Sequence, residues 1–141
     1  MPETPGGPEE TLADAFRAVS RQLRIRTQQA LAPWDVTPSQ ARALGVLARL
    51  GPVRLGTLSE RLRIAPRSAT EVVDTLATAG LVERRPDPVD RRATLVALTA
   101  RGTEVMSTIH AARAAEADDF FARLDETDRA ALAQILHKLR A

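Results

Sequence analysis

A short basic stretch carries the clearest chemical potential of the chain: Arg84-Arg85 and Arg91-Arg92 flank Pro86-Asp87-Pro88-Val89-Asp90. Two prolines and two aspartates between strand-length segments are typical of a hairpin loop that projects from a surface. Guanidinium groups on such a loop can donate hydrogen bonds to phosphates and to base edges. The stretch therefore indicates a polyanion, above all nucleic acid, as the partner.

Other chemistries lack the residues that they need. The 141-residue chain has no Cys, which excludes disulfides, thiolate metal sites, Cys nucleophiles and thiol-based oxidant sensing. His110 and His137 fall on different predicted helices, without a carboxylate cluster at ligand spacing, so we expect no metal site and no metal cofactor. Without a Gly-rich phosphate loop or an HExxH motif, we expect no enzyme activity.

The composition limits the kinds of binding partner and the cellular compartment that we expect for this chain. Four aromatic residues are too few for a surface that stacks single-stranded bases: Phe16, Trp34, Phe120 and Phe121. No apolar run approaches the ~20 residues of a membrane span, so we expect no membrane partner. The acidic, Pro/Gly-rich residues 1–10 do not resemble a signal peptide. We expect a cytoplasmic protein with a frayed start.

The elements around the basic stretch form a recognisable order. Apolar periodicity predicts two compact helices, at about 56–62 and 66–80, which are joined by Arg63-Ile64-Ala65. This spacing is typical of a helix-turn-helix, whose second helix can enter a major groove. We expect Ala69, Val72 or Val73, Leu76 and Ala79 to face inward on that helix. Strands at about 81–85 and 93–98 then make the basic hairpin the wing of a winged helix.

Four further segments surround this core. Periodicity predicts helices at about 9–31, 37–50 and 99–121, and a last helix beyond the break at 124–128. The first and last helices carry apolar stripes that a lone winged helix does not need, so a second copy of the chain is their simplest partner. We expect a mainly α fold with a small β-hairpin wing (α+β), in one domain spanning 1–141. Its helices at about 9–32 and 99–141 would dimerise, and 37–98 would bind DNA.

The net charge of +2 hides a strong segregation. Residues 1–41 contribute −1, residues 42–101 contribute +5 from eleven Arg against six acids, and residues 102–141 contribute −2. The positive charge thus lies in the winged-helix segment. Such a distribution is the electrostatic footprint of a nucleic-acid-binding protein.

From Thr37 to Gly102 the sequence resembles the MarR family of bacterial transcription regulators. The resemblance rests on six ordered blocks, at Pro38-Ser39-Gln40, Leu58-Ser59-Glu60-Arg61-Leu62, Thr70 with Asp74, Gly80-Leu81-Val82-Glu83-Arg84, Pro88-Val89-Asp90-Arg91-Arg92 and Leu98-Thr99-Ala100-Arg101-Gly102. It implies a homodimer whose first and last helices interlock. It also implies a pseudo-palindromic double-stranded operator, with recognition helices ~34–36 Å apart, and repression that a small molecule relieves.

The helix that begins at Pro66 supplies the expected base contacts. Its first turn lies nearest the bases, which points to Arg67, Ser68, Thr70 and Glu71. Arg67 can bond guanine, and Glu71 can accept from a cytosine amine. Alternatively, Ser68 caps the helix and Glu71 pairs with a neighbouring Arg. Many family members carry Arg at the positions of Glu71 and Thr75, which suggests a different operator sequence.

The resemblance also assigns roles in the wing. Asp90-Arg91-Arg92 matches the Asp-x-Arg motif of the family, in which the carboxylate braces the second Arg for the minor groove. It implies that Arg92 enters that groove, with Arg85 and Arg91 on phosphates. Arg84 and Asp74 match structural positions that join the recognition helix to the hairpin.

An effector site is expected between the dimerisation helices and the DNA-binding lobe, as is usual in the family. Phe16, Trp34, Leu44 and His110 are the candidates to contact a small organic ligand, although Trp34 also suits interhelical packing. A competing interpretation is a winged helix that binds a protein without sequence-specific DNA binding. Such a module would tolerate an uncharged wing, whereas this wing is rich in Arg.

Overall fold

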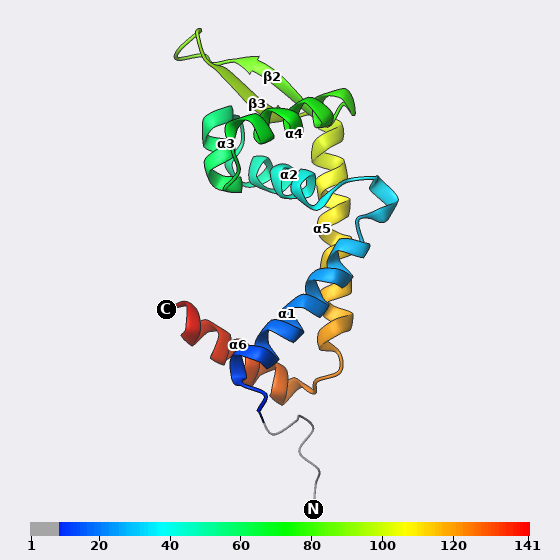
Figure 1. The fold of residues 1–141 in the computed structure, drawn as a ribbon. Helices are drawn as coiled ribbons and strands as arrows, with labels where there is room; N and C mark the ends of the chain where they lie inside the picture. The colour runs from blue at the N-terminus through cyan, green and yellow to red at the C-terminus, as the bar shows by residue number, and fades with distance from the viewer. Residues whose placement is uncertain (1–8) are drawn as a thin grey trace, which may run out of the picture. The chain divides into compact units, whose positions relative to one another are not determined.

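The structure, a computed structural model, describes residues 9–141. The frayed start expected at the N-terminus lies mostly outside this range. The helices are α1 (Leu12–Gln29), the 3₁₀ turn η1 (Ala32–Trp34), α2 (Pro38–Leu50), α3 (Leu55–Leu62), α4 (Pro66–Thr78), α5 (Ala100–Phe121) and α6 (Glu126–Arg140), and the strands are β1 (Val53–Arg54), β2 (Val82–Pro86) and β3 (Thr94–Leu98) (Figure 1). The predicted mainly helical fold with a hairpin wing is confirmed.

The chain forms two compact units. Residues 31–112 make one, which we name the lobe. The other, the outer unit, consists of the chain up to Ala30 together with residues 113–141. Helix α5 begins in the lobe and ends in the outer unit.

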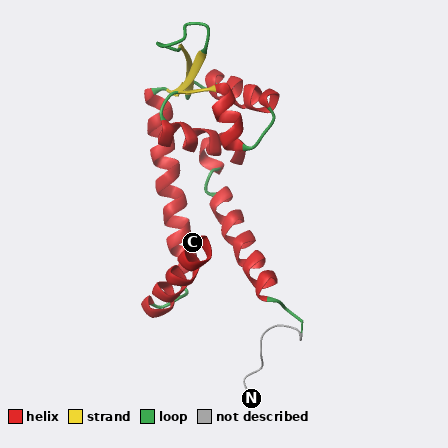
Figure 2. Cartoon of the chain, turned by 90° about the vertical axis from the view of Figure 1, so that its left-hand side faces the viewer, coloured by secondary structure: helices red, strands yellow, loops and turns green. Residues whose placement is uncertain are grey.

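The lobe has a continuous apolar core. Helices α2, α3 and α4 pack on a small sheet, and Leu44, Leu58 and Leu76 are almost fully buried between them. The sheet has the order β1-β3-β2 and is antiparallel throughout, with Arg54 opposite Leu95 and Val82 opposite Leu98. Its strands are drawn in yellow in Figure 2. Burial of these side chains supplies the main stabilisation of the lobe.

Local sequence explains where the helices of the lobe begin and end. Thr37 and Gln40 form a capping box at the start of α2, and Gly51, with a φ of 74°, ends this helix. Arg63 ends α3 in the left-handed region, with a φ of 54°, and thereby makes the tight turn before α4. The predicted helix-turn-helix and its three-residue connection are confirmed.

One of the positions predicted to face inward on α4 was wrong. Ala69, Val73 and Leu76 are buried as expected, and Val73 rather than Val72 is the fully buried valine. Ala79, predicted to face inward, is exposed. The helix ends at Thr78, one residue before the predicted inward position, so Ala79 caps the helix instead of extending its buried face.

The junction between β3 and α5 is a close contact within the lobe. Thr99 donates its hydroxyl hydrogen to the Gly80 carbonyl and accepts from the Gly102 amide, at 2.6 and 3.0 Å. Thr99 is therefore the N-cap of α5, which begins at the next residue. Gly102 lies so close to Leu81 that an added Cβ would stand 1.9 Å from the Leu81 carbonyl oxygen. Only glycine fits this approach without a backbone shift.

The outer unit has no comparable core. Helices α1 and α6 contain no buried residue. Arg26 of α1 bonds Glu116 of α5 at 3.2 Å and also pairs with Asp119, while its guanidinium lies 5.8 Å from the centre of the Phe120 ring. The hydrogen bond to Asp119 raises the pKa of Arg26 above its usual value, so the cation persists at any working pH. Polar contacts and one cation–π contact thus join α1 to α5.

Candidate nucleic-acid interface

The first turn of α4 presents most of its predicted contact residues. Pro66, Arg67, Ser68 and Glu71 are exposed, and Thr70 is half-buried. The N-cap residue Ala65 has no side-chain acceptor, and no side chain caps this helix. Ser68 therefore does not serve as the cap, so the alternative role as a helix cap is wrong. Pro66 has no amide hydrogen and the Ala69 amide donates to the Ala65 carbonyl, so the amides of Arg67 and Ser68 are the ones that this turn leaves without a side-chain cap.

The two charged residues of this turn face one another. The Arg67 Nε atom lies 3.9 Å from the Glu71 carboxylate, and both side chains are largely exposed. A pair of this kind contributes little to stability, so DNA can open it at small cost. The hydroxyls of Thr70 and Thr75 donate to the carbonyls of Pro66 and Glu71 at 3.0 Å, which leaves their oxygens as acceptors.

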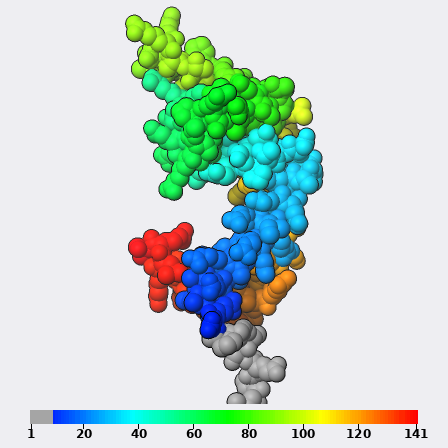
Figure 3. Space-filling model, in the orientation of Figure 1, coloured from blue at the N-terminus to red at the C-terminus, as the bar shows by residue number. Residues whose placement is uncertain are grey.

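The wing projects from the same lobe and is drawn in yellow-green at the top of Figure 3. Arg84 of β2 pairs with Asp74 of α4, which confirms the expected tie between recognition helix and hairpin. Arg85 donates to Glu83 at 2.6 Å, within its own strand. The hairpin is therefore joined to α4 by a side-chain pair as well as by the chain.

The tip of the wing carries the two remaining arginines. Arg91 and Arg92 are exposed, and no carboxylate from residue 9 onward lies within ion-pair distance of either guanidinium. Asp90 accepts from the backbone amide of Arg92 at 3.1 Å. The carboxylate thus fixes the backbone at Arg92 and leaves the guanidinium group exposed to solvent.

Asp87 is a residue of this loop that the sequence did not single out. Its side chain is almost buried, and it accepts from Arg54 and from two backbone amides of the loop. The amide of Val89, followed by Arg54, lowers the pKa of Asp87 below its usual value. The Asp-Pro pattern suggests such a turn, but nothing local reveals Arg54, which lies 33 positions earlier.

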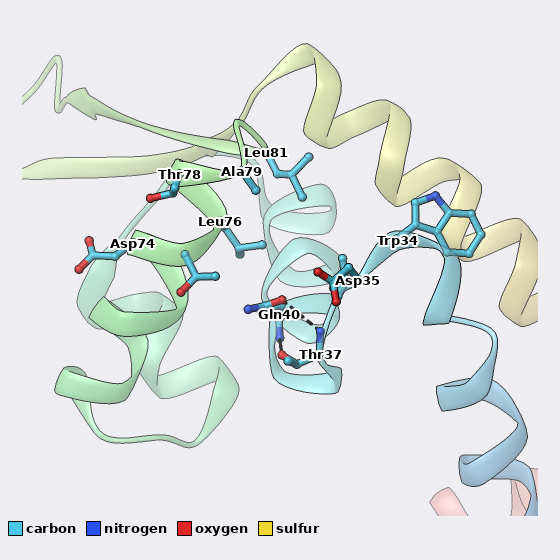
Figure 4. Close-up of a pocket in the computed structure, with 11 residues that line it drawn as sticks. Trp34, Asp35, Thr37, Gln40, Asp74, Leu76, Thr78, Ala79 and Leu81 are labelled. Carbon is cyan, nitrogen blue, oxygen red and sulfur yellow. Dashed lines mark hydrogen bonds between the residues drawn. The ribbon is translucent and has the colours of Figure 1, made fainter.

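A cavity of about 640 Å³ lies in the lobe, between the start of α2 and the C-terminal half of α4 (Figure 4). Apolar side chains, hydroxyls, an amide and two carboxylates line it: Trp34, Asp35, Val36, Thr37, Gln40, Asp74, Thr75, Leu76, Thr78, Ala79 and Leu81. Its volume falls within the usual range of small-molecule sites.

The four predicted ligand residues do not converge on this cavity. Trp34 alone lines it. Leu44 is fully buried in the lobe core, His110 is exposed on α5, and Phe16 belongs to the outer unit. Within residues 9–141, no group of three or more acidic or histidine side chains could hold a metal ion. No helix over the same range is long and apolar enough to cross a membrane.

A helix-turn-helix followed by an antiparallel, arginine-tipped hairpin defines a winged helix-turn-helix protein. Residues 34–93 match the sequence profile of the MarR family. The HTH-type transcriptional regulator ML2140 of Mycobacterium leprae is 39% identical to the chain, over 72% of this chain and 68% of its own length. The HTH-type transcriptional regulator Mb0904 of Mycobacterium bovis is 36% identical, over 84% of this chain and 80% of its own length.

Solved structures agree with these relatives. RV1404 from Mycobacterium tuberculosis is 32% identical, with a TM-score of 0.82 over 93% of this chain and 92% of its own. A MarR mutant from E. coli, 24% identical, gives a TM-score of 0.85 over 96% of this chain and all of its own, and shows the likeness of fold. The chain belongs to the MarR family and is a DNA-binding transcription regulator.

Proposed function

We propose that this regulator is a homodimeric repressor that binds a pseudo-palindromic operator in double-stranded DNA and is released by a small organic ligand. The observation that carries the proposal is the exposure of Arg91 and Arg92 on the wing of the same lobe that exposes the first turn of α4. The excess of +5 over residues 42–101 supports it, because phosphate neutralisation dominates DNA affinity.

In this proposal the two elements have different tasks. Arg67, Ser68, Thr70 and Glu71, beginning at Pro66, contact bases and phosphates in the major groove. Arg92 enters the adjacent minor groove, where negative potential concentrates, while Arg85 and Arg91 contact phosphates. Asp90 supports the wing by holding the Arg92 backbone. This mechanism needs no metal or cofactor, and its place of action is the cytoplasm, where bacterial DNA resides.

The outer unit supports the homodimer. Six large apolar side chains of α1 and α6 are more than two-fifths exposed: Leu12, Phe16, Val19, Ile25, Ile135 and Leu139. An apolar surface of this kind marks a protein interface. A second copy of the chain offers the same helices, so the surface can be buried symmetrically.

Arg92→Ala tests the wing assignment directly. We expect operator affinity in a mobility-shift assay to fall about 5- to 150-fold, which corresponds to the loss of about 1–3 kcal/mol typical of a good groove contact. Arg123→Ala, an equal charge change in the outer unit, is the matched control and should leave affinity nearly unchanged. Equal effects of the two variants would contradict the assignment.

Glu71→Ala separates sequence readout from the alternative, a winged helix that binds a protein without sequence-specific DNA binding. Direct readout predicts a changed base preference at one position of each half-site, with a smaller change in overall affinity. A selection from randomised operator sequences measures it. A uniform loss of affinity for all sequences would count against direct readout, and absence of any preferred sequence would favour the alternative.

We propose the cavity beside α4 as the effector site. A ligand there would touch both the start of α2 and the C-terminal half of α4, and it would release DNA only by favouring one arrangement of the two over the other. Trp34 lines the cavity and is the only tryptophan of the chain, so its fluorescence reports on occupancy. A compound that weakens operator binding without altering Trp34 fluorescence would place the site elsewhere.

A further inference from the structure

One almost buried carboxylate holds the wing loop. Asp87 is 7% exposed, and its Oδ2 atom accepts from Nε and Nη2 of Arg54 at 3.1 and 2.9 Å. Its Oδ1 atom accepts from the amides of Val89 and Asp90 at 2.9 and 3.4 Å. Both oxygens are thus engaged, one toward the body of the lobe and one toward the loop tip.

Arg54 connects this carboxylate to the helix-turn-helix. It is the last residue of β1 and the N-cap of α3, and its backbone pairs with Leu95 of β3. The base of the wing is therefore fixed to the start of α3 twice, by the strand pairing and by the Arg54–Asp87 pair. Charge-assisted bonds from two nitrogens of one guanidinium also restrict the geometry of the pair.

A continuous set of hydrogen bonds leads from Asp87 to Arg92. The Asp87 amide donates to the Ala93 carbonyl at 3.0 Å, and the Ala93 amide donates to the Asp90 carbonyl at 2.9 Å. The amide of Asp90 donates to the carboxylate of Asp87, and the carboxylate of Asp90 accepts from the amide of Arg92. These bonds connect the buried carboxylate, through Asp90 and Ala93, to the backbone at Arg92.

From this geometry we infer that Asp87 and Arg54 are positioning residues for DNA binding. They hold the wing loop in its binding conformation before DNA arrives, so that Arg92 loses little conformational freedom on entering the groove. Ordering a loop only on binding reduces affinity, because the lost entropy is taken from the interaction energy. The inference rests on the proposed DNA contact of Arg92, and it adds two residues that need not touch DNA.

Asp87→Asn distinguishes positioning from simple electrostatics, because the two predict opposite signs. Removal of a negative charge from a DNA-binding lobe should tighten binding if only net charge matters. If Asp87 positions the wing, the same variant should weaken operator binding, by about tenfold, since several loop residues lose their order. Glu104→Gln is the matched control, because it makes the same charge change at an exposed residue of the lobe, on α5, and should not weaken binding.

Two double variants show whether the effect passes through the proposed pathway. Arg54→Ala combined with Asp87→Asn should bind DNA about as weakly as either single variant, since each breaks the same pair. In an Arg92→Ala background, Asp87→Asn should have little further effect on affinity. A general loss of fold would instead add to the Arg92→Ala defect, and thermal unfolding of each variant checks that the lobe is intact at the assay temperature.

The outcomes separate this inference from the proposed function. If Arg92→Ala weakens binding and Asp87→Asn leaves it equal or tighter, the positioning role is wrong and the wing contact stands. If Arg92→Ala has no effect, the wing contact itself is wrong. Additive defects of Asp87→Asn and Arg92→Ala would also overturn the positioning role, because Asp87 would then act independently of Arg92.

Discussion

The lobe buries its large apolar side chains within one chain, whereas the outer unit leaves most of its own exposed. In the lobe, Leu44, Leu58 and Leu76 are at most 1% exposed. In the outer unit, Phe16, Ile135 and Leu139 are 54%, 54% and 73% exposed. The two regions belong to one chain, so the contrast reflects how each region obtains its stability.

A helix that buries nothing is only marginally stable alone, because intrinsic propensity rarely offsets the entropy of ordering the backbone. Helices α1 and α6 have capped N-termini, at Thr11 and Asp125, and amphipathic sequences, yet they contain no buried residue. The comparison teaches that the lobe buries its apolar side chains within one chain, while those of the outer unit stay exposed unless the proposed homodimer covers them. Four predictions test this division, from the largest expected effect to the smallest.

Leu44→Ala tests the self-sufficient core. The side chain is fully buried, so truncation leaves a cavity and should reduce the free energy of unfolding by about 2–5 kcal/mol. Denaturant unfolding of the isolated lobe segment and of the whole chain measures this loss, which should not depend on protein concentration. A loss below 1 kcal/mol would show that the core of the lobe is loosely packed.

Ile135→Asp tests the incomplete core of the outer unit. A carboxylate buried in a dimer interface without a partner is costly, so the dissociation constant of the dimer should rise about tenfold or more. Leu50→Asp, an equivalent change at an exposed leucine of α2 in the lobe, is the control. Over a range of protein concentrations, sedimentation should show dissociation into monomers for Ile135→Asp and a dimer for Leu50→Asp. A dimer unaffected by Ile135→Asp would place the interface elsewhere.

Arg26→Gln tests how much the polar contacts of the outer unit contribute. The substitution removes the pairs with Glu116 and Asp119 and the contact with the Phe120 ring. Because these groups are partly exposed, we expect the melting temperature to fall by only a few degrees, less than for Leu44→Ala. A larger loss than that of Leu44→Ala would mean that polar contacts rather than dimer burial hold this unit together.

We expect the smallest effect from the pH dependence of the stability that the Asp87 carboxylate of the wing contributes. The pKa of Asp87 is lowered in the folded chain, so the unfolded chain binds its proton at higher pH than the folded one does. The stabilisation is therefore complete above the usual Asp range and is lost as pH falls through the lowered pKa. The stability difference between the wild type and Asp87→Asn should stay constant from about pH 8 to 5 and shrink in stronger acid. A difference that shrinks already near pH 6 would contradict the lowered pKa.

Local patterns predicted much of the lobe. The helix predicted at about 37–50 agrees with α2, whose ends are set by Thr37 and Gly51, because caps and turn residues act over a few positions. The hairpin strands were placed within one residue of their observed bounds, and the Arg84–Asp74 tie was expected from the family pattern. Such features depend on neighbouring residues or on a motif of fixed spacing.

Features that depend on distant residues were missed. Asp87 looks like an ordinary turn residue until the β1–β3 pairing brings Arg54 to it. Ala79 fits the helical period, but the end of α4 at Thr78 removes it from the buried face. The four ligand candidates were predicted from their side-chain types alone. The structure distributes them among the lobe core, the cavity, the exposed surface of α5 and the outer unit, because packing between distant residues decides where each one lies.

The pairing of β1 with β3 has a consequence for the order in which the lobe folds. Val53 and Arg54 meet Val96 and Leu95 only after some forty intervening residues have been brought together, including both helices of the helix-turn-helix. Closing a loop of this length is slow unless the intervening segment is already compact. We expect the wing to reach its final shape late, so a chain with an ordered wing has already assembled the helix that reads the operator.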